Sequence, residues 1–568
     1  MSEGTRRDFL KITAAAATVG VLGAASSAPG KRVAVLGGGV AGLSAAHELV
    51  ERGFDVTVYE RKALGGKARS ITAPGNLPGE HGFRFFPGFY FDLTDTMRRT
   101  PYPGNADGCW GNLTRATSYL MARQGRPDLT APFPFPLPPN PRIYDLASLV
   151  STVISGLQTL FKLSFSEAEF FAQKIGVYAT SCDERRLGQW DRLTWADFVR
   201  SGWFSDEYNK FVADGTIRNL AATKSKDAST HSIGLVGEAT LWSALGLGNE
   251  PGGSVDRVLD GATSEMWIDP WVSHLGSRGV KFNVGWAVDG LNLVNGKIAS
   301  AASAGRTIDA DWFVVSMPSE RAAKLMSPAL VAADARLGNI ARLRQDWMNG
   351  LMFYLKQEFP LTPGHVNYVD SAWAVTSISQ AQFWKRDFST YGDGTVKDCL
   401  STIISDWFTP GTFNGRKAVD CTPQEIAAEA WAEIKAHLND TGTRLTDDML
   451  HSWFLDPAIQ SGTNDEPLFI QHPGSWALRP DSRTGIQNLF LAGDWVRTPI
   501  NVTTMEGANQ GARLAVNALL DAAGSSAPRC SVHQLYRSPL FDLDKAEDRV
   551  RYRLGLPNKW DVRDTRWP

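Results

Sequence analysis

Two glycine-bearing segments constrain this 568-residue chain more than any other feature, although more than 400 residues separate them. The first covers residues 32–60 and reads RVAVLGGGVAGLSAAHELVERGFDVTVYE. The second covers residues 488–520 and begins NLFLAGDW. Each contains a short apolar run, a glycine turn and a helical pattern, which together predict a strand, a turn and a helix. The two segments therefore predict the first and last parts of one domain.

The first segment has the pattern of a dinucleotide-binding turn. Its apolar run Val33–Leu36 predicts a buried parallel strand. Three glycines follow in the GxGxxG spacing. Gly37 allows a tight turn, Gly39 lets the backbone approach a pyrophosphate, and Gly42 lets the next helix pack closely on the strand. The amides at the start of that helix, predicted over residues 43–52, would point at the phosphates.

The residues after this turn favour FAD over NAD. The second predicted strand ends at Glu60, at about the 20-residue distance expected for a carboxylate that accepts both ribose hydroxyls. Gly65, Gly66, Lys67 and Arg69 follow directly. Two glycines and two cations can wrap the diphosphate and the flavin end of FAD. A plain nicotinamide dehydrogenase has no need of this second cradle.

The second segment fits the other end of the same cofactor. Leu489–Leu491 predicts the last buried strand, and Gly493 permits close approach in the turn that follows. The backbone of Asp494 can reach the pyrophosphate and its side chain the ribitol hydroxyls. The N-terminus of a predicted helix, Met505–Leu520, would face the isoalloxazine. Its positive dipole end would stabilise the negative charge of the reduced flavin.

Composition excludes several classes of protein. The chain is 43% hydrophobic and 21% charged, as in ordinary globular proteins, and its net charge of −2 gives no reason to expect nucleic-acid binding. Its five cysteines form no CxxC pair and its nine histidines show no metal-ligand spacing. No metal site and no disulfide framework are predicted, although one isolated bridge stays open.

The N-terminal 28 residues are predicted to be a twin-arginine signal segment. Arg6 and Arg7 lie in the sequence TRRDFLK, and the Ala-rich stretch Ile12–Ala25 is too short and weak for a membrane span. This route exports folded proteins, which suits one that must acquire FAD first. It predicts a periplasmic or other extracytoplasmic location, with peripheral membrane association open. An ordinary basic tail is the alternative.

We predict an α/β fold with a Rossmann-like, glutathione-reductase-like FAD-binding domain and an inserted α+β substrate-binding domain. The predicted FAD-binding parts are residues 31–100, 276–325 and 476–525. The predicted substrate domain comprises a mainly helical part, residues 101–275, and a second part, residues 326–475, while residues 526–568 form a loop-rich tail without an assigned role.

Patterns within these parts predict individual elements. The Pro-rich stretch 131–142 is a loop. Residues 143–171 read as one helix with an apolar face, either a core helix or a membrane-facing or substrate-entry helix. Further expectations are strands at 279–284, 312–316, 350–357 and 400–407, a continuation of the nucleotide-binding sheet at 288–293 with a hairpin return at 296–303, and a helix at 424–438.

Over roughly residues 31–520 the chain resembles the FAD-dependent phytoene and zeta-carotene desaturases, with hydroxysqualene dehydroxylase as a relative, within the flavin amine oxidase superfamily. The resemblance rests on the two glycine segments, on EHGFRFFPGFY at residues 80–90, on LDGA at 259–262 and on MEGA at 505–508. Three departures stand out. Arg84 replaces the histidine of the plant-type enzymes, Met266 replaces a substrate-side arginine, and the spacing from Asp494 to Met505 is one residue longer.

The resemblance and the motifs together predict the site residues. Near-flavin candidates for catalysis are His81, Arg84 and Trp495, and no general base is identified. Val288 is the candidate for a strand residue near the adenine. The predicted cofactor-binding residues are Gly37, Gly39, Val40, Ala41, Gly42, Glu60, Arg61, Gly66, Lys67, Arg69, Arg84, Phe85, Tyr90, Val288, Gly493, Asp494 and Met505.

The resemblance implies hydride transfer between flavin N5 and an activated, usually allylic, carbon of a long apolar isoprenoid or lipid. It implies a quinone or oxygen as electron acceptor. Two alternatives stay open. One is a flavin amine oxidase, although its terminal motif usually reads Gly-Glu where this chain has Gly493 and Asp494. The other is an exported flavoprotein that carries electrons without turnover. The sequence predicts no oligomeric state.

Overall fold

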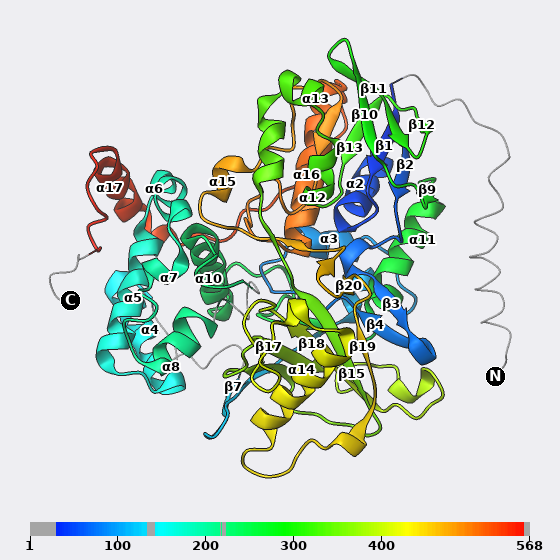
Figure 1. Cartoon of the computed structure of the whole chain (residues 1–568). Helices are drawn as coiled ribbons and strands as arrows, with labels where there is room; N and C mark the ends of the chain where they lie inside the picture. Colours follow the sequence, from blue (N-terminus) through cyan, green and yellow to red (C-terminus); the bar gives the residue numbers. More distant parts are fainter. Residues whose placement is uncertain (1–29, 133–142, 216, 218–222, 562–568) are drawn as a thin grey trace.

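A five-stranded parallel sheet draws its strands from three distant parts of the chain (Figure 1). The computed structural model describes residues 30–132, 143–215, 217 and 223–561. The predicted signal segment and residues 133–142 of the Pro-rich stretch lie outside the described residues. In sheet order the strands are β23 (Leu489–Leu491), β13 (Trp312–Val315), β1 (Arg32–Leu36), β2 (Asp55–Glu60) and β9 (Lys281–Val284).

Every neighbouring pair in this sheet is parallel, so the carboxyl ends of all five strands share one edge. β1, β13 and β23 are largely apolar and buried because both faces of this part of the sheet are covered, whereas the edge strand β9 has no buried residue. Two helices, α2 (Val40–Glu51) and α16 (Met505–Ala522), pack against each other. They are the two helices that the glycine segments predict.

A seven-stranded sheet forms the second large sheet of the structure and lies in the predicted substrate domain. In sheet order its strands are β19 (Leu450–Leu455), β15 (Asn349–Leu355), β18 (Asp398–Ile404), β17 (Val375–Ser379), β16 (Gly364–Tyr368), β6 (Ser118–Ala122) and β7 (Leu129–Pro132). Side chains alternate between its faces. Leu351 and Phe353 share a core with α14 (Pro423–Leu438), whereas Met352 lies on the opposite face and contacts residues 77–82.

A helical region lies beside these sheets, at the left of Figure 1. It contains α4 (Leu146–Phe161), α5 (Phe165–Thr180), α6 (Asp183–Gly188), α7 (Trp195–Phe198), α8 (Asp206–Tyr208) and α10 (Thr230–Ala244). The single helix expected over residues 143–171 is wrong. Lys162 adopts a φ of 55° and ends α4, and Ser164 begins α5 through a capping box with Glu167. Leu149 and Leu157 of α4 are buried.

One more prediction needs correction. Residues 288–293 do not continue the parallel sheet, because β10 (Gly290–Val294) pairs with β11 (Lys297–Ser303) and β12 (Arg306–Ile308) in a separate three-stranded sheet. The predicted loop-rich tail also contains α17 (Asp542–Arg553), which packs on α5 and α6 and buries Asp548 against Arg185.

Further elements complete the described chain. Within it, no helix combines the length and the apolar character needed to cross a bilayer. All five cysteines are free and buried, so no bridge forms. Additional elements include the hairpin β3 (Ser70–Ala73) and β4 (Leu77–Glu80), the pair β5 (Leu113–Arg115) and β8 (Arg257–Leu259), and the helices α3 (Asp92–Arg98), α11 (Asp269–Ser277), α12 (Ser319–Leu325), α13 (Pro328–Ala333) and α15 (Ser475–Leu478).

Candidate functional site

The first glycine turn has the geometry predicted for it. Gly37 follows β1 with a φ of 119°, and a Cβ there would lie 2.9 Å from the backbone nitrogen of Met317. Gly39 is the N-cap of α2. A Cβ on Gly42 would overlap the carbonyl oxygen of Gly37. Only glycine therefore allows α2 to begin this close to the end of β1.

The second cradle packs directly on the first. Gly65 donates its backbone N–H to the carbonyl of Gly38 at 2.8 Å. A Cβ on Gly66 would lie 2.9 Å from the Cα of Gly39. No side chain separates the two loops at this contact. Their bare backbone, at the N-terminus of α2, is a surface that a diphosphate can approach closely.

Glu60 lies at the carboxyl end of β2, beside this backbone. Its carboxylate accepts the N–H of Gly38 at 2.8 Å and that of Lys62 at 2.7 Å. The carbonyl of Glu60 accepts the N–H of Trp286 at 2.9 Å, which holds the chain leaving β9 near the same point. Val288 lies in the link between β9 and β10, so the expectation of a strand residue there is wrong.

The cations of the cradle meet an acidic segment that sequence reasoning missed. Asp465 pairs with Arg61 at 2.9 Å and with Lys62 at 2.6 Å, and Glu466 lies 3.6 Å from Arg69. Burial raises the pKa of Asp465, but hydrogen bonds from Lys62 and Arg61 more than offset this and lower it overall. Lys67 donates to the carbonyl of Pro467. Residues 465–467 therefore hold Arg61, Lys67 and Arg69 at the rim of the cradle.

The second glycine segment reaches the same edge through β23. Gly493 has a φ of 142°, and a Cβ there would lie 2.6 Å from the indole nitrogen of Trp495. That indole donates to the carbonyl of Met317 at 2.9 Å, and Trp495 is fully buried among core residues. Trp495 therefore packs beneath the Gly493 turn as a structural residue. This burial argues against the catalytic role for which Trp495 was a candidate.

Asp494 brings the two segments into electrostatic contact. Burial raises the pKa of its carboxyl, while the nearby Lys67 and Arg479 act in the opposite direction. The residue keeps some accessible surface despite its depth. Asp494 therefore lies close to Lys67 of the second cradle, and its predicted contacts with the pyrophosphate and the ribitol hydroxyls stay a prediction.

Residues 80–93 are anchored to the start of α16. The carboxylate of Glu506 accepts three backbone N–H groups, from Phe91 at 3.1 Å, Asp92 at 2.9 Å and Leu93 at 2.7 Å. The Tyr90 hydroxyl bonds with Thr504, the N-cap of α16, and burial raises the pKa of Tyr90. Met505 is half-buried at the first position of this helix. The Met505-Glu506-Gly507 sequence therefore holds the N-terminus of α16 against residues 80–93.

Arg84 links that block to the cradle. Its guanidinium donates to the backbone carbonyls of Gly82 and Lys67. Burial lowers the pKa of Arg84, and the charges of Glu80 and Asp456 oppose this. Phe83 and Phe85, on either side of Arg84, contact the ring of a histidine on β16.

His81 lies in a buried cluster with Asp456 and Glu466. Its Nδ1 pairs with Asp456; burial raises the pKa of that acid, but the hydrogen bond and charge of His81 bring it to about 2. His81 Nε2 is buried with no partner among the described residues. Ligand-type atoms of His81, Asp456 and Glu466 lie within 4.8 Å of one another. A metal ion there would meet Lys62 and the nearby arginines that already neutralise Glu466.

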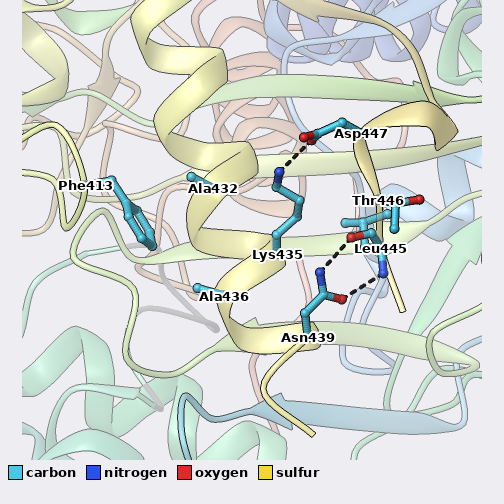
Figure 2. Close-up of a pocket in the computed structure, with 8 residues that line it drawn as sticks. All are labelled: Phe413, Ala432, Lys435, Ala436, Asn439, Leu445, Thr446 and Asp447. Carbon is cyan, nitrogen blue, oxygen red and sulfur yellow. Dashed lines mark hydrogen bonds and ion pairs between the residues drawn. The ribbon is translucent and has the colours of Figure 1, made fainter. Parts of the chain in front are cut away.

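These residues fit FAD. The bare glycine backbone suits a diphosphate, Glu60 a ribose, and the dipole end of α16 a reduced flavin. A separate surface depression of about 500 Å³ lies beside α14 (Figure 2). Its polar side chains already bond to one another, as Lys435 does with Asp447 and Asn439 with Leu445. That depression shows none of the cradle's features.

Residues 40–520 match the family described as flavin containing amine oxidoreductase. The chain belongs to this family. Its cofactor is FAD, and it is an FAD-dependent oxidoreductase of the desaturase-like type. Membership accounts for both glycine segments, because the matched span begins in the first and ends in the second.

Relatives and solved structures agree with this placement. The chain is 23% identical to zeta-carotene desaturase from Synechocystis sp., covering 86% of this chain and 97% of that protein. It is 25% identical to carotenoid phi-ring synthase from Streptomyces griseus, covering 87% and 88%. Cyclohexylamine oxidase from Brevibacterium oxydans shares the fold, with a TM-score of 0.58, 14% identity, and 87% and 99% of the two chains covered. An oxidoreductase from Methanosarcina mazei has a TM-score of 0.55, at 17% identity and with 85% and 98% covered.

Proposed function

We propose that this chain transfers a hydride between FAD and an allylic carbon of a hydrophobic isoprenoid or lipid. The curated relatives support this substrate class, since two of them are named for carotenoid chemistry. The amine oxidases among the solved structures share less than 25% identity and support the fold alone.

The contact between residues 83–85 and the seven-stranded sheet carries the proposal. Phe83, Arg84 and Phe85 each keep accessible surface although they follow the cradle into the interior. Both phenylalanines pack on His365 of β16. Aromatic side chains with free surface, next to a residue that holds the cradle, suit an apolar substrate lying against the flavin.

Met266 supports a substrate other than phytoene. It stands where the desaturases that the chain resembles have a substrate-side arginine. Its sulfur accepts from the hydroxyl of Tyr102 at 3.5 Å, and its side chain packs against Gly261. This position provides polarisable apolar surface and no positive charge.

The protein supplies placement and electrostatics to this chemistry. Bound FAD provides the two-electron hydride acceptor or donor. The cradle of Gly37, Gly39 and Gly66 would hold the diphosphate, and Glu60 would hold the ribose. The start of α16 presents its positive dipole end where negative charge develops.

An anaerobic flavin titration tests the proposal. The purified protein is mixed with squalene-type, carotenoid-type and amine substrates while the oxidised-flavin band, at roughly 450 nm, is followed. We expect an isoprenoid to bleach the band and to yield a desaturated product. Bleaching by amines alone would replace the proposal with amine oxidation. A band that no substrate bleaches would favour an electron carrier.

We also propose export by the twin-arginine route through residues 1–28, with a quinone or oxygen as electron acceptor. The Arg6-Arg7 pair and the weak apolar stretch after it support export. Fractionation of cells that express the chain, compared with an Arg6→Lys, Arg7→Lys variant, tests it. Retention of the wild type in the cytoplasm would refute it. Reoxidation of the reduced flavin by a soluble quinone or by oxygen identifies the acceptor.

A further inference from the structure

Asp256, His365 and Tyr119 form a polar group where the seven-stranded sheet meets Phe83 and Phe85. His365 lies on β16 and Tyr119 on the neighbouring strand β6, and the two residues are partners in the parallel register. They share one face of the sheet, the face opposite to that of Leu120 and Val366, which pack in the α14 core. The group therefore lies on the side of the sheet that meets the FAD-binding domain.

A continuous chain of side-chain contacts connects this polar group to the cradle. Arg84 donates to the carbonyl of Lys67. Phe83 and Phe85 flank Arg84, and their ring centroids lie 5.1 Å and 6.0 Å from that of His365. His365 is thus one aromatic layer from a residue that touches the cofactor cradle.

The pair of Asp256 and His365 has unused hydrogen-bonding capacity. Asp256 Oδ2 lies 2.6 Å from His365 Nε2, an ion-pair approach that is not aligned as a hydrogen bond. Asp256 Oδ1 is buried and has no partner among the described residues. Nδ1 of His365 makes no hydrogen bond within the described chain, and 12% of the side chain is exposed. Under-satisfied buried polar groups in native proteins call for an explanation, and a catalytic role is one of the recognised explanations.

We propose that His365 is the proton acceptor of the reaction and that Asp256 is its positioning residue. This inference rests on the proposed function. The charge of Asp256, whose Oδ2 lies 2.6 Å from Nε2, favours the tautomer with its proton on Nε2, which leaves the lone pair on Nδ1. The substrate loses a hydride, with its bonding pair, from one carbon to FAD. It loses a proton from the adjacent carbon to Nδ1, and the electrons of that C–H bond form the new double bond. FAD gains two electrons and one proton, and the imidazole gains the other proton.

The surrounding charges suit a base that becomes cationic. Asp256 faces the imidazole and stabilises its protonated form. Burial raises the pKa of Tyr119, and the charge of Asp256 adds to this, so the tyrosine stays neutral. The segment that packs on His365 also carries Glu80 and Arg84, whose charges oppose each other.

A His365→Gln variant tests the proposal in rapid anaerobic mixing with the isoprenoid that reduces the wild type. His451→Gln is the matched control, because His451 is exposed on β19 of the same sheet. We expect His365→Gln to keep the wild-type flavin content and urea midpoint. We expect its flavin to be reduced at least about 100-fold more slowly, because general-base catalysis contributes about that much. The inflection in the wild-type profile of reduction rate against pH should be absent in His365→Gln.

An Asp256→Asn variant separates positioning from structure. Loss of the anion destabilises the imidazolium, so the inflection of the reduction rate should move to lower pH while flavin content stays unchanged. His365→Gln that reduces its flavin within about threefold of wild type, with an unchanged pH profile, would overturn the proposal. If His365→Gln loses its flavin, the Asp256→Asn variant decides. An inflection of its reduction rate at the wild-type pH overturns the proposal, and an inflection at lower pH supports it. A wild type that no isoprenoid reduces would refute the proposed function itself, and this role with it.

Discussion

Glu506 provides the sharpest test of how the second segment builds the site. Its carboxylate is buried and accepts three backbone N–H groups, from Phe91, Asp92 and Leu93, through both of its oxygens. The change to test is Glu506→Gln, which preserves size and shape. Because both oxygens accept N–H bonds, either orientation of the amide directs its NH₂ group at a backbone donor.

The structure sets the size of the effect. With the amide oxygen in place of Oε1, the bonds from Phe91 and Asp92 remain, and the 2.7 Å bond from Leu93 is lost. A buried donor left unsatisfied costs about 1–3 kcal/mol. The facing N–H and NH₂ groups add to this, so we expect a loss of about 2–4 kcal/mol in the free energy of unfolding. Because Glu506 joins α16 to the 80–90 block, flavin affinity should fall too.

The assay is urea unfolding followed by flavin release, together with the ratio of flavin to protein after purification. The matched control is Glu425→Gln. Glu425 also accepts a backbone N–H, that of Thr422 in its own capping box, but it does so at the surface, so Glu425→Gln should shift the urea midpoint less than Glu506→Gln does. Equal urea midpoints and equal flavin contents for the two variants would refute the anchoring role of Glu506.

The pH dependence gives a second check on Glu506. Burial raises the pKa of Glu506, and the neighbouring Asp92 raises it further. A carboxyl whose folded pKa is raised contributes stability at low pH that is lost as pH rises. Glutamine does not titrate, so the gap between wild type and variant should be largest in acid and shrink toward high pH. A gap that widens with pH would contradict this sign.

Three further outcomes follow from single contacts. Gly42→Ala should abolish flavin binding, measured by absorbance after purification, because its Cβ would overlap a carbonyl of the preceding turn. Asp456→Asn should make the free energy of unfolding less sensitive to acid. In the wild type this free energy should fall by about 2 kcal/mol as pH falls from about 4 to about 2, because each pKa unit is worth about 1.4 kcal/mol. Urea unfolding across that pH range measures the difference. Asp548→Ala leaves the buried Arg185 unpaired and should cost about 3–5 kcal/mol. Arg549→Ala, at an exposed ion pair on the same helix, should leave the urea midpoint close to that of the wild type in the same denaturation assay.

The cofactor cradle was predictable from sequence because its determinants are local. Gly37, Gly39 and Gly42 act through backbone approach within one turn, and Glu60 follows at a fixed distance. The same reasoning could have found the break at Ser164, since Ser164 and Glu167 form a capping box that is visible in the sequence. The apolar periodicity on either side concealed it.

Other parts of the site depend on contacts between distant residues. Asp465 meets Arg61 across 404 positions, and nothing near either residue marks the other as its partner. α17 is held by Asp548, which binds Arg185 across 363 positions, so the charged tail gave no local sign of a docked helix. His365 and Asp256 come together only after the sheet forms.

This difference between local and long-range contacts explains why the sequence predicts the cofactor more precisely than it predicts the substrate. The cradle is largely backbone and glycine, so chains that share only 12–17% identity retain the fold that builds it. The proposed substrate side is built from side chains such as Phe83, Met266 and His365, which make no hydrogen bond to the glycine turns within the described residues. Arg84 and Met266 are two of the places where this chain departs from the desaturases it resembles. Met266 makes no hydrogen bond to the cradle in the described part of the chain, whereas Arg84 joins the cradle to the aromatic side chains that pack on His365.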